Sequence, residues 1–193
     1  MLVRSLPATC SVLKNCNLLK NNLDMESATM LSKIGAEKGI MLSGMERGQT
    51  EASFMNKDLE PADAILIASD LQFLAVLTVL DLHDNKIGVD GAKAIAEALK
   101  VNPVLTSLDL QMNSIGDDGA KAIAEALKVN PVLTELQSGG NSIGIDGAKA
   151  IAEALKVSPV LTKLYLNNNN LGDAGGKAVR EAVKDRSGFE LGM

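Results

Sequence analysis

The sequence has few of the side chains from which catalytic and metal sites are built. It contains one histidine, His83, and no cysteine or serine is placed as its partner. A nucleophilic triad therefore cannot be assembled. Asp81 and Asp109, taken together with His83, do not complete a closed set of metal ligands. We expect no catalytic residue, no metal site and no cofactor.

Aromatic residues and positive charge are also scarce. Aromatics make up 2% of the 193 residues, so the core has to be built from Leu, Ile, Val and Ala. Acidic residues outnumber Lys and Arg by 24 to 19, and this balance disfavours binding to nucleic acid or to an anionic membrane. The apolar runs are too short to cross a bilayer, and residues 1–10 lack the apolar core of a signal peptide. With only two cysteines in the chain, a reduced, cytoplasmic setting is expected.

What the chain has instead is a repeat. Leu77, Leu105, Leu133 and Leu161 lie 28 residues apart and open the segments LTVLDLHDNKIG, LTSLDLQMNSIG, LTELQSGGNSIG and LTKLYLNNNNLG. In the first three of these units the segment GAKAIAEALKV then recurs unchanged. A fixed period of this length predicts a solenoid, in which each unit buries its apolar face against its neighbours.

Each unit contains the signals of one strand and one helix. Leu80 and Leu82 alternate with polar residues, which predicts a short strand with both leucines on one face. Residues 91–100 carry apolar side chains at helical spacing, with Asp90 as the expected N-cap. The Asn-Pro pair ending at Pro103 should stop this helix. Strands joined through such helices must run parallel.

The pattern LxxLxLxxNxIG resembles the leucine-rich repeat. A 28-residue period with a full helix is similar to the ribonuclease-inhibitor subtype, which also occurs in NOD-like receptors and in Ran GTPase-activating protein. The resemblance implies an α/β solenoid of about six repeats, with a parallel sheet on the concave face and helices on the convex face. It also implies that one asparagine of each unit bonds to the backbone in the bend after the strand; these are Asn21, Asn85, Asn113, Asn141 and Asn169.

We expect residues 1–193 to form a single repeat domain with irregular ends. Its expected parts are an irregular N-terminal segment at 1–12, two degenerate repeats at 13–76 with an insertion near 40–48, regular repeats at 77–174, and a terminal helix with a strand stub at 175–193. Arg180 replaces an alanine of the earlier helices and indicates a polar cap. Ser138 interrupts a column of core leucines, so restoring leucine there should stabilise the fold.

Candidate binding residues are the positions of each strand that the repeat leaves variable. Equal positions on adjacent parallel strands lie side by side, so these residues should form three rows on the sheet. The first row is Glu51, Val79, Ser107, Glu135 and Lys163; the second is Ser53, Asp81, Asp109, Gln137 and Tyr165; the third is Met55, His83, Gln111, Gly139 and Asn167. All but Met55 and Gly139 are taken as candidate protein-binding residues.

The second row is the most specific of the three. Asp81 and Asp109 are predicted neighbours of like charge, which is unfavourable unless a cation or a basic partner group lies between them. Tyr165, the only tyrosine, is the kind of residue that anchors protein interfaces. The alternative is a hydrated polar strand face with no partner.

These features favour a protein–protein interaction scaffold that binds through its concave sheet face. The partner is expected to be a protein carrying basic groups, with neither nucleic acid nor membrane involved. Two alternatives remain open by analogy of fold: a regulator of an enzyme, of the inhibitor or small-GTPase-activator type, and a repeat-array fragment of a NOD-like sensor. A further alternative is that the chain is a fragment with no independent role.

Overall fold

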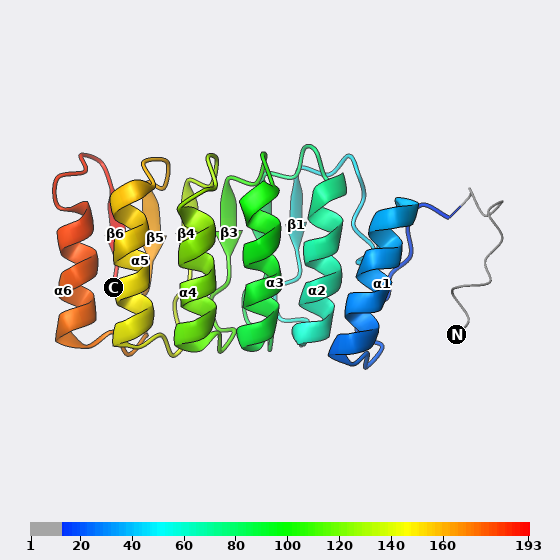
Figure 1. The fold of residues 1–193 in the computed structure, drawn as a ribbon, viewed down its shortest axis with the longest axis horizontal. Helices are drawn as coiled ribbons and strands as arrows, with labels where there is room; N and C mark the ends of the chain where they lie inside the picture. Colours follow the sequence, from blue (N-terminus) through cyan, green and yellow to red (C-terminus); the bar gives the residue numbers. More distant parts are fainter. Residues whose placement is uncertain (1–12) are drawn as a thin grey trace.

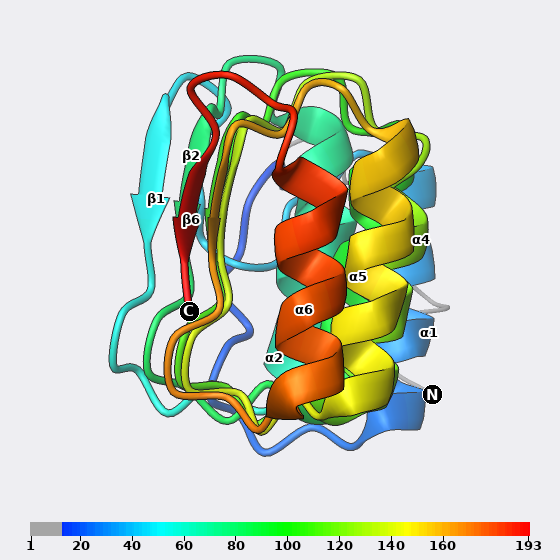
Figure 2. The same cartoon turned by 90° about the vertical axis from the view of Figure 1, so that its left-hand side faces the viewer.

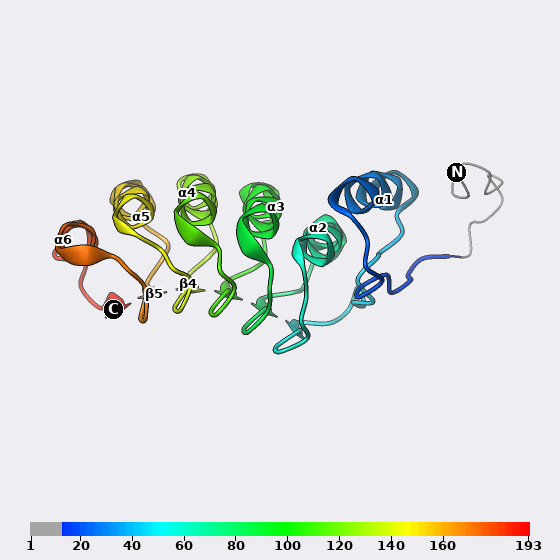
Figure 3. The same cartoon turned by 90° about the horizontal axis from the view of Figure 1, so that it is seen from below.

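Helices and strands alternate along residues 13–193, the part of the chain that the computed structural model describes. The helices lie side by side in one layer and the strands form a second layer behind them (Figure 1). Seen from below, both layers follow an arc, with the helices on its outer side and the strands on its inner side (Figure 3). The predicted α/β solenoid, with the parallel sheet on the concave face and the helices on the convex face (Figure 3), is confirmed.

The elements follow the predicted repeat. The helices are α1 Met25–Lys38, α2 Pro61–Asp70 with the 3-10 turn η2 Leu71–Phe73, α3 Gly88–Val101, α4 Gly116–Leu127, α5 Ile145–Val157 and α6 Gly172–Val183. The strands are β1 Glu51–Ser53, β2 Val79–Asp81, β3 Ser107–Asp109, β4 Glu135–Gln137, β5 Lys163–Tyr165 and β6 Glu190–Gly192. Within residues 13–193 no helix is long and apolar enough to cross a membrane.

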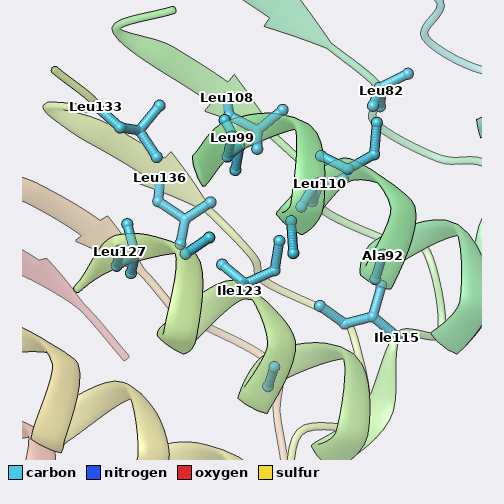
Figure 4. Packing of buried hydrophobic residues seen from close by; sticks show 14 of the residues in the cluster. Leu82, Ala92, Leu99, Leu108, Leu110, Ile115, Ile123, Leu127, Leu133 and Leu136 are labelled. Carbon is cyan, nitrogen blue, oxygen red and sulfur yellow. The ribbon is translucent and has the colours of Figure 1, made fainter. Parts of the chain in front are cut away.

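The six strands form one sheet in the order β1-β2-β3-β4-β5-β6, and every neighbouring pair is parallel. Its register follows the period, because Leu80 pairs with Leu108 and Leu136 pairs with Leu164. These four leucines are completely buried. Figure 4 shows Leu108 and Leu136 from the strands meeting helix residues such as Ile123 between the two layers. A core of stacked aliphatic columns explains why so few aromatics are needed.

The asparagine column joins each unit to the one before it. The Asn113 side-chain amide donates to the carbonyl oxygens of Leu82 (2.8 Å) and Gln111 (2.9 Å), and its oxygen accepts from the Ile87 N–H (3.3 Å). Asn85, Asn141 and Asn169 make the equivalent contacts. These bonds satisfy backbone groups that a sharp bend would otherwise leave unpaired. The role implied by the resemblance is therefore present in these units.

The N-cap prediction for Asp90 was wrong. Helix α3 begins at Gly88 after Ile87, so Asp90 lies inside the first turn. The Gly88 N–H donates instead to the Asn113 backbone oxygen at 2.9 Å. A carboxylate cap is unnecessary because the neighbouring repeat supplies an acceptor to this helix end.

A second polar column lies at the opposite end of the helices. The Asn130 side chain donates to the Leu99 carbonyl oxygen (2.6 Å) and accepts from the N–H groups of Val132 (2.9 Å) and Leu133 (2.7 Å). Asn102 makes the same set of bonds one repeat earlier. From the sequence, this Asn-Pro pair was interpreted only as a helix stop. Its recurrence at the same repeat position could have indicated that the asparagine also bonds to the neighbouring repeat.

The first predicted unit is only half formed. Its helix α1 packs on α2, but Leu13, the residue at which the first degenerate repeat was predicted to begin, is 40% exposed. Residues 15 and 17 make isolated bridges to residues 41 and 43, and none of residues 13–24 joins the six-stranded sheet. The predicted insertion supplies the bridging segment, whose Leu42 and Ser43 amides donate to the buried Asp70 carboxylate at 2.8–2.9 Å. The segment predicted at 1–12 falls outside the described residues.

Candidate binding surface on the concave sheet face

The concave face of the sheet is open because the helices cover only the other face (Figure 2). In β2, β3 and β4 the central leucine is buried and the residues on either side of it are half-buried. The parallel register places Val79 beside Ser107, Ser107 beside Glu135, and Asp81 beside Asp109. The first two predicted rows are therefore present as contiguous lines of side chains.

The third row lies just beyond the strands and is held by further backbone hydrogen bonds. The N–H groups of Asn56 and Asp84 donate to the carbonyl oxygens of His83 (2.9 Å) and Gln111 (3.0 Å) respectively. In the later units, the Gly140 N–H donates to the Asn167 oxygen at 2.8 Å. All the sequence-predicted candidates thus lie on one face of the solenoid.

Hydrogen bonds within the protein hold both Asp81 and Asp109. Asp81 accepts hydrogen bonds from the Ser53 hydroxyl (2.8 Å) and from the His83 backbone N–H (2.9 Å). Asp109 accepts from the Gln111 backbone N–H (2.8 Å) and side-chain amide (3.1 Å). These bonds stabilise both carboxylates, while the Asp81 charge still contributes to raising the pKa of Asp109.

Burial and the neighbouring His83 side chain shift the pKa of the Asp109 carboxyl in opposite directions. The His83 Nδ1 atom lies 3.8 Å from Asp109 Oδ2, and the Asp109 side chain is only 17% exposed. Burial raises the pKa of Asp109 above its ordinary value of 3.8, while the bonds from Gln111 and the nearby imidazole oppose that rise. No cluster of three His, Cys, Asp or Glu side chains suited to a metal occurs in the described part of the chain.

A chain of polar contacts crosses the middle of the face. The Gln111 side-chain amide donates to Gln137 Oε1 at 2.7 Å, and the Gln137 amide donates to Glu135 Oε1 at 3.0 Å. Lys163 Nζ lies 3.4 Å from Glu135 Oε2. These cross-strand contacts hold the exposed side chains in defined orientations, which reduces the ordering that binding would require.

Tyr165 is held by a residue that sequence reasoning missed. Its hydroxyl donates to the carboxylate of Glu190 on β6, and this bond raises the pKa of Tyr165 to about 12. Glu190 pairs with Lys163 across the strands and so extends the first row. The signal was available, because a strand stub was predicted within residues 175–193, and Glu190 lies there between the apolar residues Phe189 and Leu191.

The surface as a whole is acidic. Five carboxylates lie along these rows, against Lys163 and the single imidazole; they belong to Glu51, Asp81, Asp109, Glu135 and Glu190. Such a surface can accept hydrogen bonds and attract cationic groups.

Comparisons with known proteins agree with this architecture. The Leucine Rich repeat family profile matches residues 74–96, 101–124 and 157–179, so the chain carries leucine-rich repeats. Among solved structures it is similar to actin-binding site 2 of leiomodin-1, at 25% identity and a TM-score of 0.60, over 84% of this chain and 88% of that one.

A second similar structure is the tropomodulin C-terminal domain from Caenorhabditis elegans. It has 14% identity and a TM-score of 0.58, and the match covers 84% of this chain and 92% of that one. At that identity the likeness concerns the fold alone. A comparison with curated proteins gave no match.

Proposed function

We propose that this chain is a protein-binding module whose concave sheet face holds a partner with basic groups. The observation that carries the proposal is the surplus of half-buried carboxylates along a rigid, uncovered sheet. Opposite charge speeds the encounter of two proteins and selects the register in which they dock. The role is binding rather than catalysis, exercised by a single repeat domain.

We also assign the repeats to the ribonuclease-inhibitor-like subtype. Support comes from the 28-residue period and from helices α3–α6, which have 12 to 14 residues each. Regulation of an enzyme and a sensor-array origin rest on that resemblance only, and no contact in the geometry favours either.

A charge-reversal experiment tests the concave site. A tagged protein carrying Asp81→Lys and Asp109→Lys is compared with the wild type for capture of partners from native lysate, followed by measurement of affinity for the partner identified. Glu97→Lys with Glu125→Lys is the matched control, because it makes the same charge change on the convex helices. Loss of the partner only in the concave variant is expected. Equal retention in both variants would remove the concave face from the proposal.

The substitutions themselves could disturb packing, since Asp109 is largely buried. Asp81→Asn with Asp109→Asn keeps the side-chain size and removes only the charge. We expect this pair to weaken partner binding while the thermal unfolding midpoint changes little. If the affinity for the partner varies with the unfolding midpoint of the variants and not with their charge, the electrostatic argument is contradicted.

Actin is a second candidate partner. Support comes from the 25% identity to a leiomodin-1 domain described as an actin-binding site, over most of both chains. Co-sedimentation with filamentous actin, and the rate of assembly of fluorescently labelled monomeric actin, test this directly. Actin binding weakened by the concave substitutions would identify the same surface, whereas no effect on sedimentation or assembly would exclude actin.

A further inference from the structure

A row of exposed valines lies along the edge of the solenoid where the helices end. Val101, Val129 and Val157 occupy the same repeat position and are 78%, 59% and 59% exposed. Each is followed two residues later by an exposed proline. We call these three valines the valine ridge. A row of large aliphatic side chains this open, repeated on successive helices, is a feature of interaction surfaces.

An apolar groove continues the valine ridge toward the N-terminal units. Leu74, Ala75 and Ala98 line it, together with Val101. The groove lies where α2 passes into the 3-10 turn η2 beside α3. Ala98 is partly exposed there, whereas its equivalents in α4 and α5 are completely buried. Toward the C-terminus the valine ridge ends, because the equivalent position of the next repeat is an aspartate.

Lysines accompany the valines. Lys100, Lys128 and Lys156 each precede a ridge valine, and each contacts a glutamate three residues earlier in its own chain at 2.5 Å. Each glutamate lies about one helical turn before its lysine, and each lysine adjoins a ridge valine in the sequence. Exposed pairs of this kind are weak, and a carboxylate from another molecule can share the ammonium at little cost.

We propose that the valine ridge and its groove bind an acidic amphipathic helix from a partner protein, lying across α3, α4 and α5. Packed helices are spaced by about 8–10 Å. A partner helix returns the same face every seven residues, a rise of about 10.5 Å. Leucines seven residues apart can therefore meet successive ridge valines, while flanking glutamates reach the lysines. This surface is separate from the concave face and does not depend on the function proposed for it.

The test uses synthetic peptides three heptads long as probes. One carries leucines along one face with flanking glutamates, a second replaces these glutamates by lysine, and a third has the composition of the first in scrambled order. Affinity is measured by fluorescence anisotropy with the full chain. Amide chemical-shift changes locate the bound peptide. Vesicles with and without phosphatidylserine are the parallel probe for a lipid surface.

The variants are Val101→Ser/Val129→Ser/Val157→Ser and the control Ile145→Ser. Ile145 is 42% exposed but starts a helix at the opposite edge. We expect the acidic peptide to bind, the shifts to centre on the ridge, and the triple variant to lose about tenfold or more in affinity through lost apolar contact. The control should bind as the wild type does.

Several outcomes would overturn the proposal. They are equal binding of the acidic and scrambled peptides, stronger binding of the lysine peptide, shifts confined to the concave face, or binding to vesicles without binding to any peptide. Because all three valines are exposed, the triple variant should keep the wild-type unfolding midpoint. If the unfolding midpoint of the triple variant falls, the affinity of the single variant Val101→Ser is compared with that of the wild type instead.

Discussion

Replacing Ser158 by asparagine should raise the free energy of unfolding. Ser158 occupies the repeat position of Asn102 and Asn130, is buried, and its hydroxyl has no hydrogen-bond partner among residues 13–193. At the same position of the next unit, the Arg186 guanidinium reaches back to the carbonyl oxygen of Pro159 at 3.0 Å. Ser158 is thus the position in this column whose side chain adds no hydrogen bond to its own loop.

The size of the effect follows from the equivalent units. The Asn130 side chain makes one short bond to the previous repeat and two to the amides that follow it. A typical hydrogen bond contributes about 1 kcal/mol net, and ordering the longer side chain opposes part of that gain. Removal of a buried hydroxyl without a partner adds to the benefit. We therefore expect Ser158→Asn to stabilise the fold by about 1–3 kcal/mol.

Urea denaturation followed by circular dichroism measures the change as a shift in midpoint at constant slope. Ser158→Ala is the control that removes the unpaired hydroxyl without adding new bonds, and it should be near neutral or slightly stabilising. Asn130→Ser should reproduce the present defect in the preceding unit and destabilise. A Ser158→Asn protein no more stable than Ser158→Ala would refute the reasoning, since the added amide would then have found no partners.

Three further predictions follow from the core and the concave face. Ser138→Leu should complete the column between Leu110 and Leu166 and stabilise the fold by about 2–4 kcal/mol in the same denaturation assay. A loss of stability would mean that the structure leaves no room for a leucine side chain at this position. Asn113→Ala should destabilise by more than about 2 kcal/mol, because several buried backbone groups lose their partner. The pKa of Asp109 is raised in the fold, so its contribution to stability is present below the unfolded value near 3.8 and is lost as pH rises through the folded value. Asp109→Asn should flatten that decline in a pH series of unfolding midpoints, and an unchanged profile would count against it.

The repeat period was sufficient to predict the sheet and its rows. Val79, Ser107 and Glu135 are neighbours because units of equal length bring equal positions into register. The same logic did not extend to the N-terminal unit. There the pattern at residues 13–23 matched the repeat, but the insertion after α1 supplies residues 41–43 as its partner, and the sheet begins only at β1.

Helix ends and loop columns were less predictable. Asp90 has the side chain of a capping residue, yet the acceptor for the α3 terminus comes from Asn113 in the next unit. Asn102 and Asn130 were visible as a recurring pair with proline, but proline alone already explained the helix stop. In both cases the deciding hydrogen bonds join different repeats, so a reading within one unit misses them.

The sequence by itself determined the class of fold, the parallel order of the strands and the rows of residues from β1 to β5 on the concave face, because a 28-residue unit has one way to bury its leucines against copies of itself. Only the tertiary structure decided how those residues interact. Asp81 bonds to Ser53, Gln111 to Gln137, and Tyr165 to Glu190, and each bond connects side chains 25–28 positions apart in the chain. Such contacts depend on side-chain rotamers across neighbouring strands, which the period does not specify.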